Sequence, residues 1–164
     1  MLAALLTLAL AADPVDLKGA PFRDYKEPLV VTIRGDLKMT MRASVSLRAQ
    51  DLPSYASGVE GIGFIDWRWP SSANTDGLTM TFSRPVSVVS MEAGDWGSDD
   101  DGPLELTAWN CDHQLIATVT RPWDISRNPP FEKLKIVSKG ICSVRYRSGG
   151  QFAGSTFITK IDAE

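Results

Sequence analysis

The stretch from Leu78 to Thr120 constrains the fold most, because apolar and polar residues alternate along it with a period of two. Such alternation is typical of β-strands that bury one face and expose the other. Turn residues bound each run, so the pattern predicts a ladder of half-buried strands. The residues predicted to share the buried face are Leu78, Met80, Phe82, Leu104, Leu106, Ala108, Leu115, Ala117 and Val119.

The rest of the chain adds short strand candidates between segments rich in Gly, Pro and Ser, and no helical stripe. Residues 37 to 47 alternate as one long strand or as two strands bent near Ala43. Ala49 to Gly63 and Arg121 to Glu132 are predicted to be connections, and Ser138 to Gly140 a turn. The pattern predicts an all-β, antiparallel β-sandwich of about eight to ten strands. The other strand candidates are Leu29–Arg34, Phe64–Trp69, Leu134–Val137, Ile141–Tyr146 and Ser155–Ile161.

Length and charge limit the kind of protein this can be. With 164 residues, 43% of them hydrophobic, residues 13 to 164 are expected to form one globular domain. The net charge of −3 and the scattered Lys and Arg residues argue against a nucleic-acid partner. No segment approaches the length of a transmembrane helix, so no membrane span is expected.

Residues 1 to 12 carry no charged side chain and are too short to span a bilayer. They resemble the apolar part of a secretory signal peptide, with Ala9-Leu10-Ala11 as a small-x-small cleavage site. The alternatives are an apolar N-terminal helix or a start codon assigned too far downstream. The signal-peptide interpretation predicts a protein that is secreted, periplasmic or displayed at the cell surface.

The two cysteines, Cys111 and Cys142, allow two interpretations. In an exported protein they can form a disulfide, which would close a loop of about 32 residues. Otherwise both are free thiols, with Cys142 packed as a small apolar residue. The sequence leaves both possibilities open.

The order of motifs from Leu78 to Ile161 resembles secreted bacterial jelly-roll domains of the galactose-binding-like type, found in exported proteins that often carry C-terminal sorting signals. The resemblance is carried by TFSRPVSVVSMEAGD, the aspartate-rich loop, the hairpin LELTAWNCDHQLIATVT, and the later Gly140-Ile141, Ser148-Gly149-Gly150 and Ser155 to Ile158. It departs at Thr159-Lys160, where relatives often have a carboxylate. The resemblance implies that the β-sandwich is a jelly roll that acts as a binding or structural module, and it does not imply catalysis.

The sequence contains few residues in patterns typical of an enzyme active site. The single histidine, His113, falls in a predicted turn, a poor place for the base of a catalytic triad. Asp66, Glu92 and Glu105 are candidates for a glycoside hydrolase pair by residue type, with Glu92 and Glu105 on strands that could be neighbours. The favoured function is a secreted, non-catalytic module that binds carbohydrate or a cell-surface polymer. The alternatives are a purely structural surface or adhesin-type module and, less favoured, a hydrolase.

Four residues are candidates for the binding site. Trp67 and Trp69 share a strand face with Arg68 between them, and Trp96 lies in the acidic loop. Aromatic rings can stack on the C–H face of a sugar while neighbouring polar groups bind its hydroxyls. The alternative is core packing for Trp67 and Trp69 and loop packing for Trp96.

The acidic loop is a candidate calcium site. Asp95, Asp99, Asp100 and Asp101 fall within seven residues. Calcium takes oxygen ligands and tolerates irregular geometry, although the spacing is not that of an EF-hand. The alternative, which the sequence favours, is a solvated acidic turn. Ca²⁺ is the cofactor for which the chain offers a candidate site.

Overall fold

The computed structural model describes residues 15–16, 23–25, 28–43, 47–51, 60–64, 77–95, 103–123, 131–148 and 156–164. These residues form eleven strands that all pair antiparallel, which confirms the predicted all-β fold. The strands are β1 Val15–Asp16, β2 Arg23–Tyr25, β3 Leu29–Arg34, β4 Leu37–Ala43, β5 Leu47–Asp51, β6 Glu60–Phe64, β7 Leu78–Asp95, β8 Leu104–Trp109, β9 Leu115–Arg121, β10 Glu132–Ser148 and β11 Thr156–Ala163.

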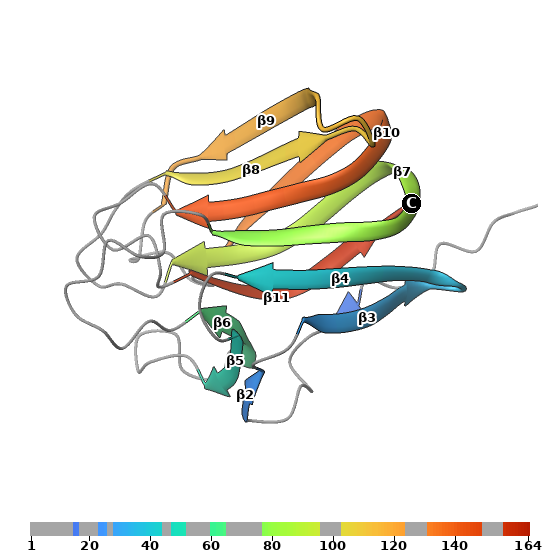
Figure 1. Cartoon of the computed structure of the whole chain (residues 1–164). Coiled ribbons are helices and arrows are strands. Elements are labelled where there is room, and N and C mark those ends of the chain that lie inside the picture. The colour runs from blue at the N-terminus through green and yellow to red at the C-terminus, as the bar shows by residue number, and fades with distance from the viewer. Residues whose placement is uncertain are drawn as a thin grey trace, which may run out of the picture.

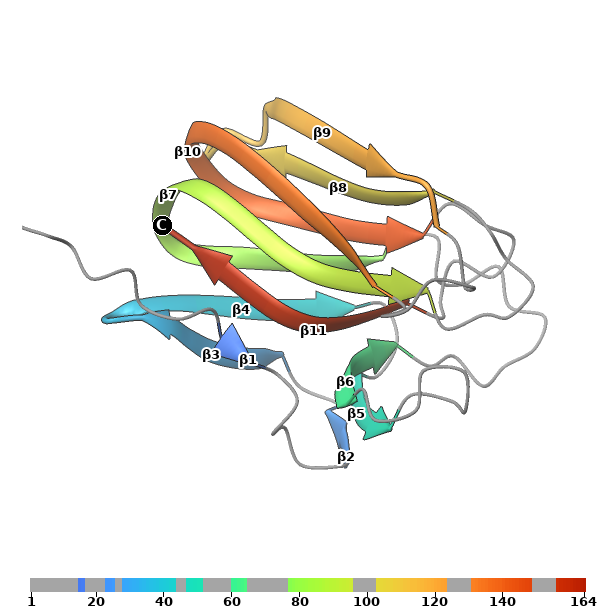
Figure 2. The same ribbon diagram turned by 180° about the vertical axis from the view of Figure 1, so that it is seen from behind.

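The strands are arranged in two packed layers (Figures 1 and 2). The first layer has the order β3, β4, the first half of β7, the second half of β10, β8 and β9. The second layer contains the first half of β10, the second half of β7, and β11, with β1 and β6 pairing to β11. The chain is therefore a β-sandwich in which β7 and β10 belong to both layers.

β7 and β10 pass from one layer to the other through residues that were predicted to end strands. Ser138 to Gly140 was predicted to separate two strands, but β10 runs through it, and so does β7 through Ser83 to Pro85. The pairing register shifts between Val137 and Ile141, and Gly140 has a φ of 77°, which favours glycine. Turn-forming residues here bend two long strands together instead of ending them.

The core lies between the layers and follows the predicted alternation with one exception. Leu78, Met80 and Leu106 are fully buried, as predicted, but Leu115 is 64% exposed. The register between β8 and β9 shifts between Ala108 and Trp109, so Ile116 contacts the core and Leu115 does not. A one-residue shift moves a side chain to the opposite face, and the sequence pattern does not reveal it.

Other boundaries differ from the predictions in the first half of the chain. Residues 37 to 43 form β4 and Leu47 begins β5, in agreement with the second alternative. The predicted connection from Ala49 to Gly63 contains the end of β5 and most of β6. β6 ends at Phe64, where a strand was predicted to begin.

One end of the sandwich is filled by aromatic side chains around Gly94. The Tyr146 hydroxyl, on the first layer, donates a buried hydrogen bond of 2.8 Å to the Gly94 carbonyl on the second. Trp123 packs edge-to-face on Phe157, with ring centroids 6.3 Å apart. A Cβ at Gly94 would lie 2.7 Å from the Trp123 ring, so any larger residue there would force the packed aromatic rings to shift.

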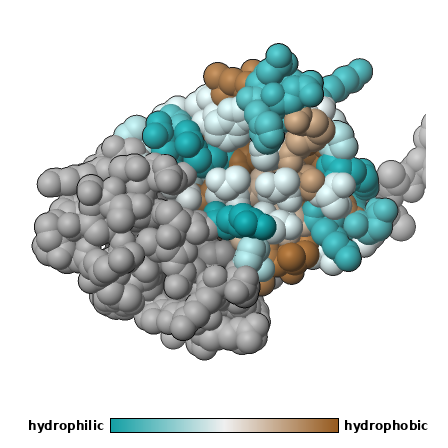
Figure 3. Space-filling model, in the orientation of Figure 1, coloured by the Kyte–Doolittle hydropathy of each residue, from teal (hydrophilic) through white to brown (hydrophobic). Residues whose placement is uncertain are grey.

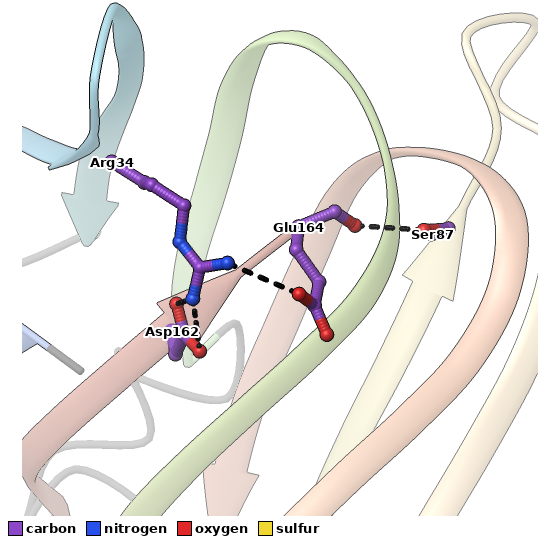
Figure 4. A network of polar contacts seen from close by, with 4 residues as sticks. All are labelled: Arg34, Ser87, Asp162 and Glu164. Atoms are coloured by element: carbon purple, nitrogen blue, oxygen red, sulfur yellow. Dashed lines mark hydrogen bonds and ion pairs between the residues drawn. The ribbon is translucent and has the colours of Figure 1, made fainter. Parts of the chain in front are cut away.

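At the other end, Arg34 connects the two layers (Figure 4). Its guanidinium donates to both carboxylate oxygens of Asp162, at 3.0 and 3.1 Å, and to Glu164 at 3.1 Å. The backbone of Glu164 pairs with Val88, and its carbonyl accepts from the Ser87 hydroxyl at 2.9 Å. These contacts hold β3 and the end of the chain against the bend in β7.

Candidate functional site

The outer side of the first layer, which faces the viewer in Figure 3, is pale at its centre with hydrophilic clusters around it. We call it the polar face and define it by three rows of residues aligned across the strands. The first row is Thr40, Thr81, Ser143, Trp109 and Leu115. The second row is Arg42, Thr79, Arg145, Thr107 and Thr118. The third row is Arg147, Glu105 and Thr120.

Trp109 and Leu115 form the apolar part of this face. They lie directly opposite each other on β8 and β9, and Leu115 is exposed because of the register shift between these strands. The guanidinium carbon of Arg145 lies 5.3 Å from the centre of the Trp109 ring, within the range of a cation–π interaction. An indole, an aliphatic side chain and a cation therefore meet among rows of hydroxyl groups.

Glu105 is the centre of a hydrogen-bonded cluster on the same face. Arg147 donates to its carboxylate through two nitrogens, at 2.9 and 3.3 Å, and the Thr107 hydroxyl donates at 3.2 Å. Partial burial alone would raise the pKa of Glu105, but the hydrogen bond and charge of Arg147 outweigh it, helped by Thr107 and the charge of Arg145. The pKa of Glu105 therefore lies below its ordinary value of 4.5, and its carboxylate is ionised at neutral pH.

This lowered pKa makes a prediction about pH. A carboxylate with a lowered pKa in the folded state stabilises the protein above its unfolded pKa, and the stabilisation is lost as the pH falls through the folded pKa. We expect the difference in free energy of unfolding between the wild type and Glu105→Gln to shrink from neutral pH to below 4.5. Urea denaturation across this range measures the difference, and a constant value would contradict the assignment.

A second polar feature lies on the outer side of the second layer. It is a shallow groove of about 280 Å³, in which Glu92, with 15% of its side chain exposed, lies 3.6 Å from Lys133 and 3.3 Å from Lys160. The carboxylate is thus shared between two lysines. The residues lining the groove are Ser90, Met91, Glu92, Lys133, Leu134, Lys135, Lys160 and Ile161.

The hairpin between β8 and β9 fixes the position of Trp109. The Asn110 side chain accepts backbone hydrogen bonds from Asp112 at 3.0 Å and Gln114 at 2.8 Å. Cys111 forms a disulfide with Cys142 of β10, with a Cα–Cα distance of 5.1 Å, which decides the question left open by the sequence. His113 is exposed in this turn, with a φ of 60°, as predicted.

The binding residues predicted from the sequence, Trp67, Arg68, Trp69 and Trp96, lie outside the described residues, as does the predicted signal peptide. Their proposed platform stays a prediction. None of the residues that the structure describes forms a helix long and apolar enough to cross a membrane.

The predicted calcium site also stays a prediction. Asp99, Asp100 and Asp101 lie outside the described residues, and the backbone of Asp95 ends β7 opposite Thr156 of β11. In the described part of the chain, no group of three or more His, Cys, Asp or Glu side chains is placed to hold a metal ion.

The idea of neighbouring carboxylates from Glu92 and Glu105 is wrong. β8 pairs with β9 and β10, so it is not next to β7, and the two side chains lie on opposite outer sides of the sandwich. They cannot face each other across a cleft as a hydrolase pair requires. Asp66 lies outside the described residues.

Trp109 and Arg145 were not predicted as site residues. The alternation contained a signal for Trp109, because it has the opposite parity to the buried Leu104, Leu106 and Ala108 and must therefore face outward. The sequence holds no comparable signal that brings Arg145 over this ring, since that depends on the pairing of β8 with β10.

Of the comparisons with known proteins, the one with solved structures found a match. No family model matches the chain, and neither does any curated protein. Among solved structures, a family 6 carbohydrate-binding module, studied by X-ray crystallography and isothermal titration calorimetry to dissect its binding sub-sites, is similar with a TM-score of 0.41 and 14% identity. The match covers 76% of this chain and 85% of that chain. The β-sandwich architecture is established by the strand pairing of the chain itself, and its galactose-binding-like assignment stays a prediction.

Proposed function

We propose that this protein is a non-catalytic module that binds a polysaccharide across the polar face. The observation that carries the proposal is the position of Trp109, half-buried on an open sheet face beside the exposed Leu115 and among rows of hydroxyl groups. An aromatic ring can stack on the C–H face of a sugar, and Thr, Ser, Arg and Glu side chains can exchange hydrogen bonds with its hydroxyls. The polar face therefore offers both stacking and hydrogen-bonding groups to a ligand that lies on it.

The regular rows also suit an extended ligand. Neighbouring strands lie about 4.8 Å apart, so the five strands that contribute to the first row extend over about 19 Å. A polymer lying along a row could contact several strands at once. The disulfide between Cys111 and Cys142 is consistent with an exported protein that meets such a polymer outside the cell.

The proposal predicts that Trp109→Ala weakens glycan binding. Loss of the aromatic platform should lower the affinity by roughly tenfold or more, whereas Trp109→Phe should keep part of it. Isothermal titration calorimetry with a panel of neutral and acidic oligosaccharides measures the change. Val137→Ala, at a side chain 69% exposed on the second layer, is the control and should have no effect.

Two results would favour the purely structural module instead. One is a wild-type protein that binds no member of the panel, and the other is a bound glycan whose affinity does not change in Trp109→Ala. Circular dichroism of each variant confirms that the fold is retained before either result is interpreted.

A further inference from the structure

Within the part of the chain that the structure describes, Arg145 differs from its neighbour Arg147 in having no carboxylate partner. Arg147 is neutralised by Glu105, at 2.9 and 3.3 Å. Among the described residues, the side chain of Arg145 makes no ion pair or hydrogen bond, and its Nε is buried without an acceptor. Its guanidinium rests against the Trp109 ring, and its charge reaches Glu105 only at longer range.

The buried Nε is closed to a ligand, but the two terminal nitrogens of the guanidinium carry N–H groups that bind nothing else among the described residues and can donate to an acceptor from outside. The cation–π contact with Trp109 needs no carbonyl or carboxylate acceptor, so it leaves these N–H groups available for a ligand. These groups form a fork that matches the two oxygens of a carboxylate. Trp109 therefore holds Arg145 close by without using its terminal N–H groups.

The charge around Arg145 points to the same kind of ligand. Arg42 lies in the same row two strands away, at about 10 Å between Cα atoms. The three rows contain three arginines and one glutamate, a net charge of +2 on a chain whose overall net charge is −3. A local excess of positive charge on an acidic protein favours an anionic ligand at that face.

We infer that the polar face selects polysaccharides that carry carboxylate groups, such as polymers of uronic acids, and that Arg145 is the specificity-determining residue. This inference rests on the function proposed above and narrows its ligand class. Arg145 binds the carboxylate through two N–H groups while the sugar ring lies over Trp109 and Leu115. Arg42 contacts a second carboxylate further along the chain.

Matched ligands test the role of the carboxylate. Oligosaccharides of galacturonate, mannuronate and glucuronate-containing polymers are titrated beside their methyl esters, which keep the sugar and remove the charge. At least one acid form should bind the wild type about 10- to 100-fold more tightly than its ester, and this preference should weaken with added salt.

Matched variants test the residue. Arg145→Gln should abolish the preference for acid over ester, and Arg145→Lys should keep part of it, because lysine keeps the charge but loses the fork. Lys135→Gln removes the same charge from an exposed side chain on the opposite layer, and the preference should remain.

Each other outcome has a defined meaning. Equal binding of every acid and its ester, or equal losses in Arg145→Gln and Lys135→Gln, overturns the inference. If neutral glycans still bind in a manner that requires Trp109, the proposed function stands without it. If no glycan binds at all, both are overturned.

Discussion

Replacing Trp123 with alanine is expected to lower the free energy of unfolding by about 3–5 kcal/mol. The side chain is 4% exposed and fills the end of the sandwich against Phe157 and Gly94. The variant would leave a large cavity beside Gly94, which has no side chain to fill it. Urea denaturation followed by fluorescence and circular dichroism measures the loss.

Two variants serve as controls for this prediction. Trp123→Phe keeps an aromatic ring against Phe157 and should lower the free energy of unfolding clearly less than Trp123→Ala does. Trp109→Ala removes the same kind of side chain from the polar face, where Trp109 is half-buried. It should also lower the free energy of unfolding by less than Trp123→Ala does. A loss in Trp123→Ala no larger than that in Trp109→Ala would contradict the assignment of Trp123 to the core.

The second large effect is expected from the disulfide. Replacing Cys111 and Cys142 together with alanine should lower the free energy of unfolding by about 3.5–4 kcal/mol, because the bridge restricts the unfolded chain over a loop of about 32 residues. The measurement is the denaturation midpoint with and without a reducing agent. The reductant should destabilise the wild type and leave the double variant unchanged, and an equal response of both proteins would contradict the prediction.

Much of the fold could be predicted because the period-two pattern reports which side of a strand is buried. Leu78, Met80 and Leu106 are buried for this reason. The pattern fails where the register shifts, as at Leu115, because a bulge depends on the partner strand. It also cannot distinguish a turn from a bend, so Ser138 to Gly140 was predicted to end a strand that continues.

Less of the candidate site than of the fold could be predicted from the sequence. Trp123 is buried although it lies in a segment predicted to be a connection, since its burial depends on contact with Phe157 from the last strand. The meeting of Trp109 with Arg145 likewise depends on the pairing of β8 with β10. Such contacts arise from long-range strand pairing, which local sequence patterns do not encode.

The most direct test of the polar face as the binding surface is the indole N–H spectrum of the protein during a glycan titration. The chain has five tryptophans, so each can be assigned from a single Trp→Phe variant. We predict that the Trp109 signal shifts with saturation while the signal of the buried Trp123 does not. A shift of the Trp67, Trp69 or Trp96 signals with Trp109 unchanged would contradict the polar face and favour the platform expected from the sequence.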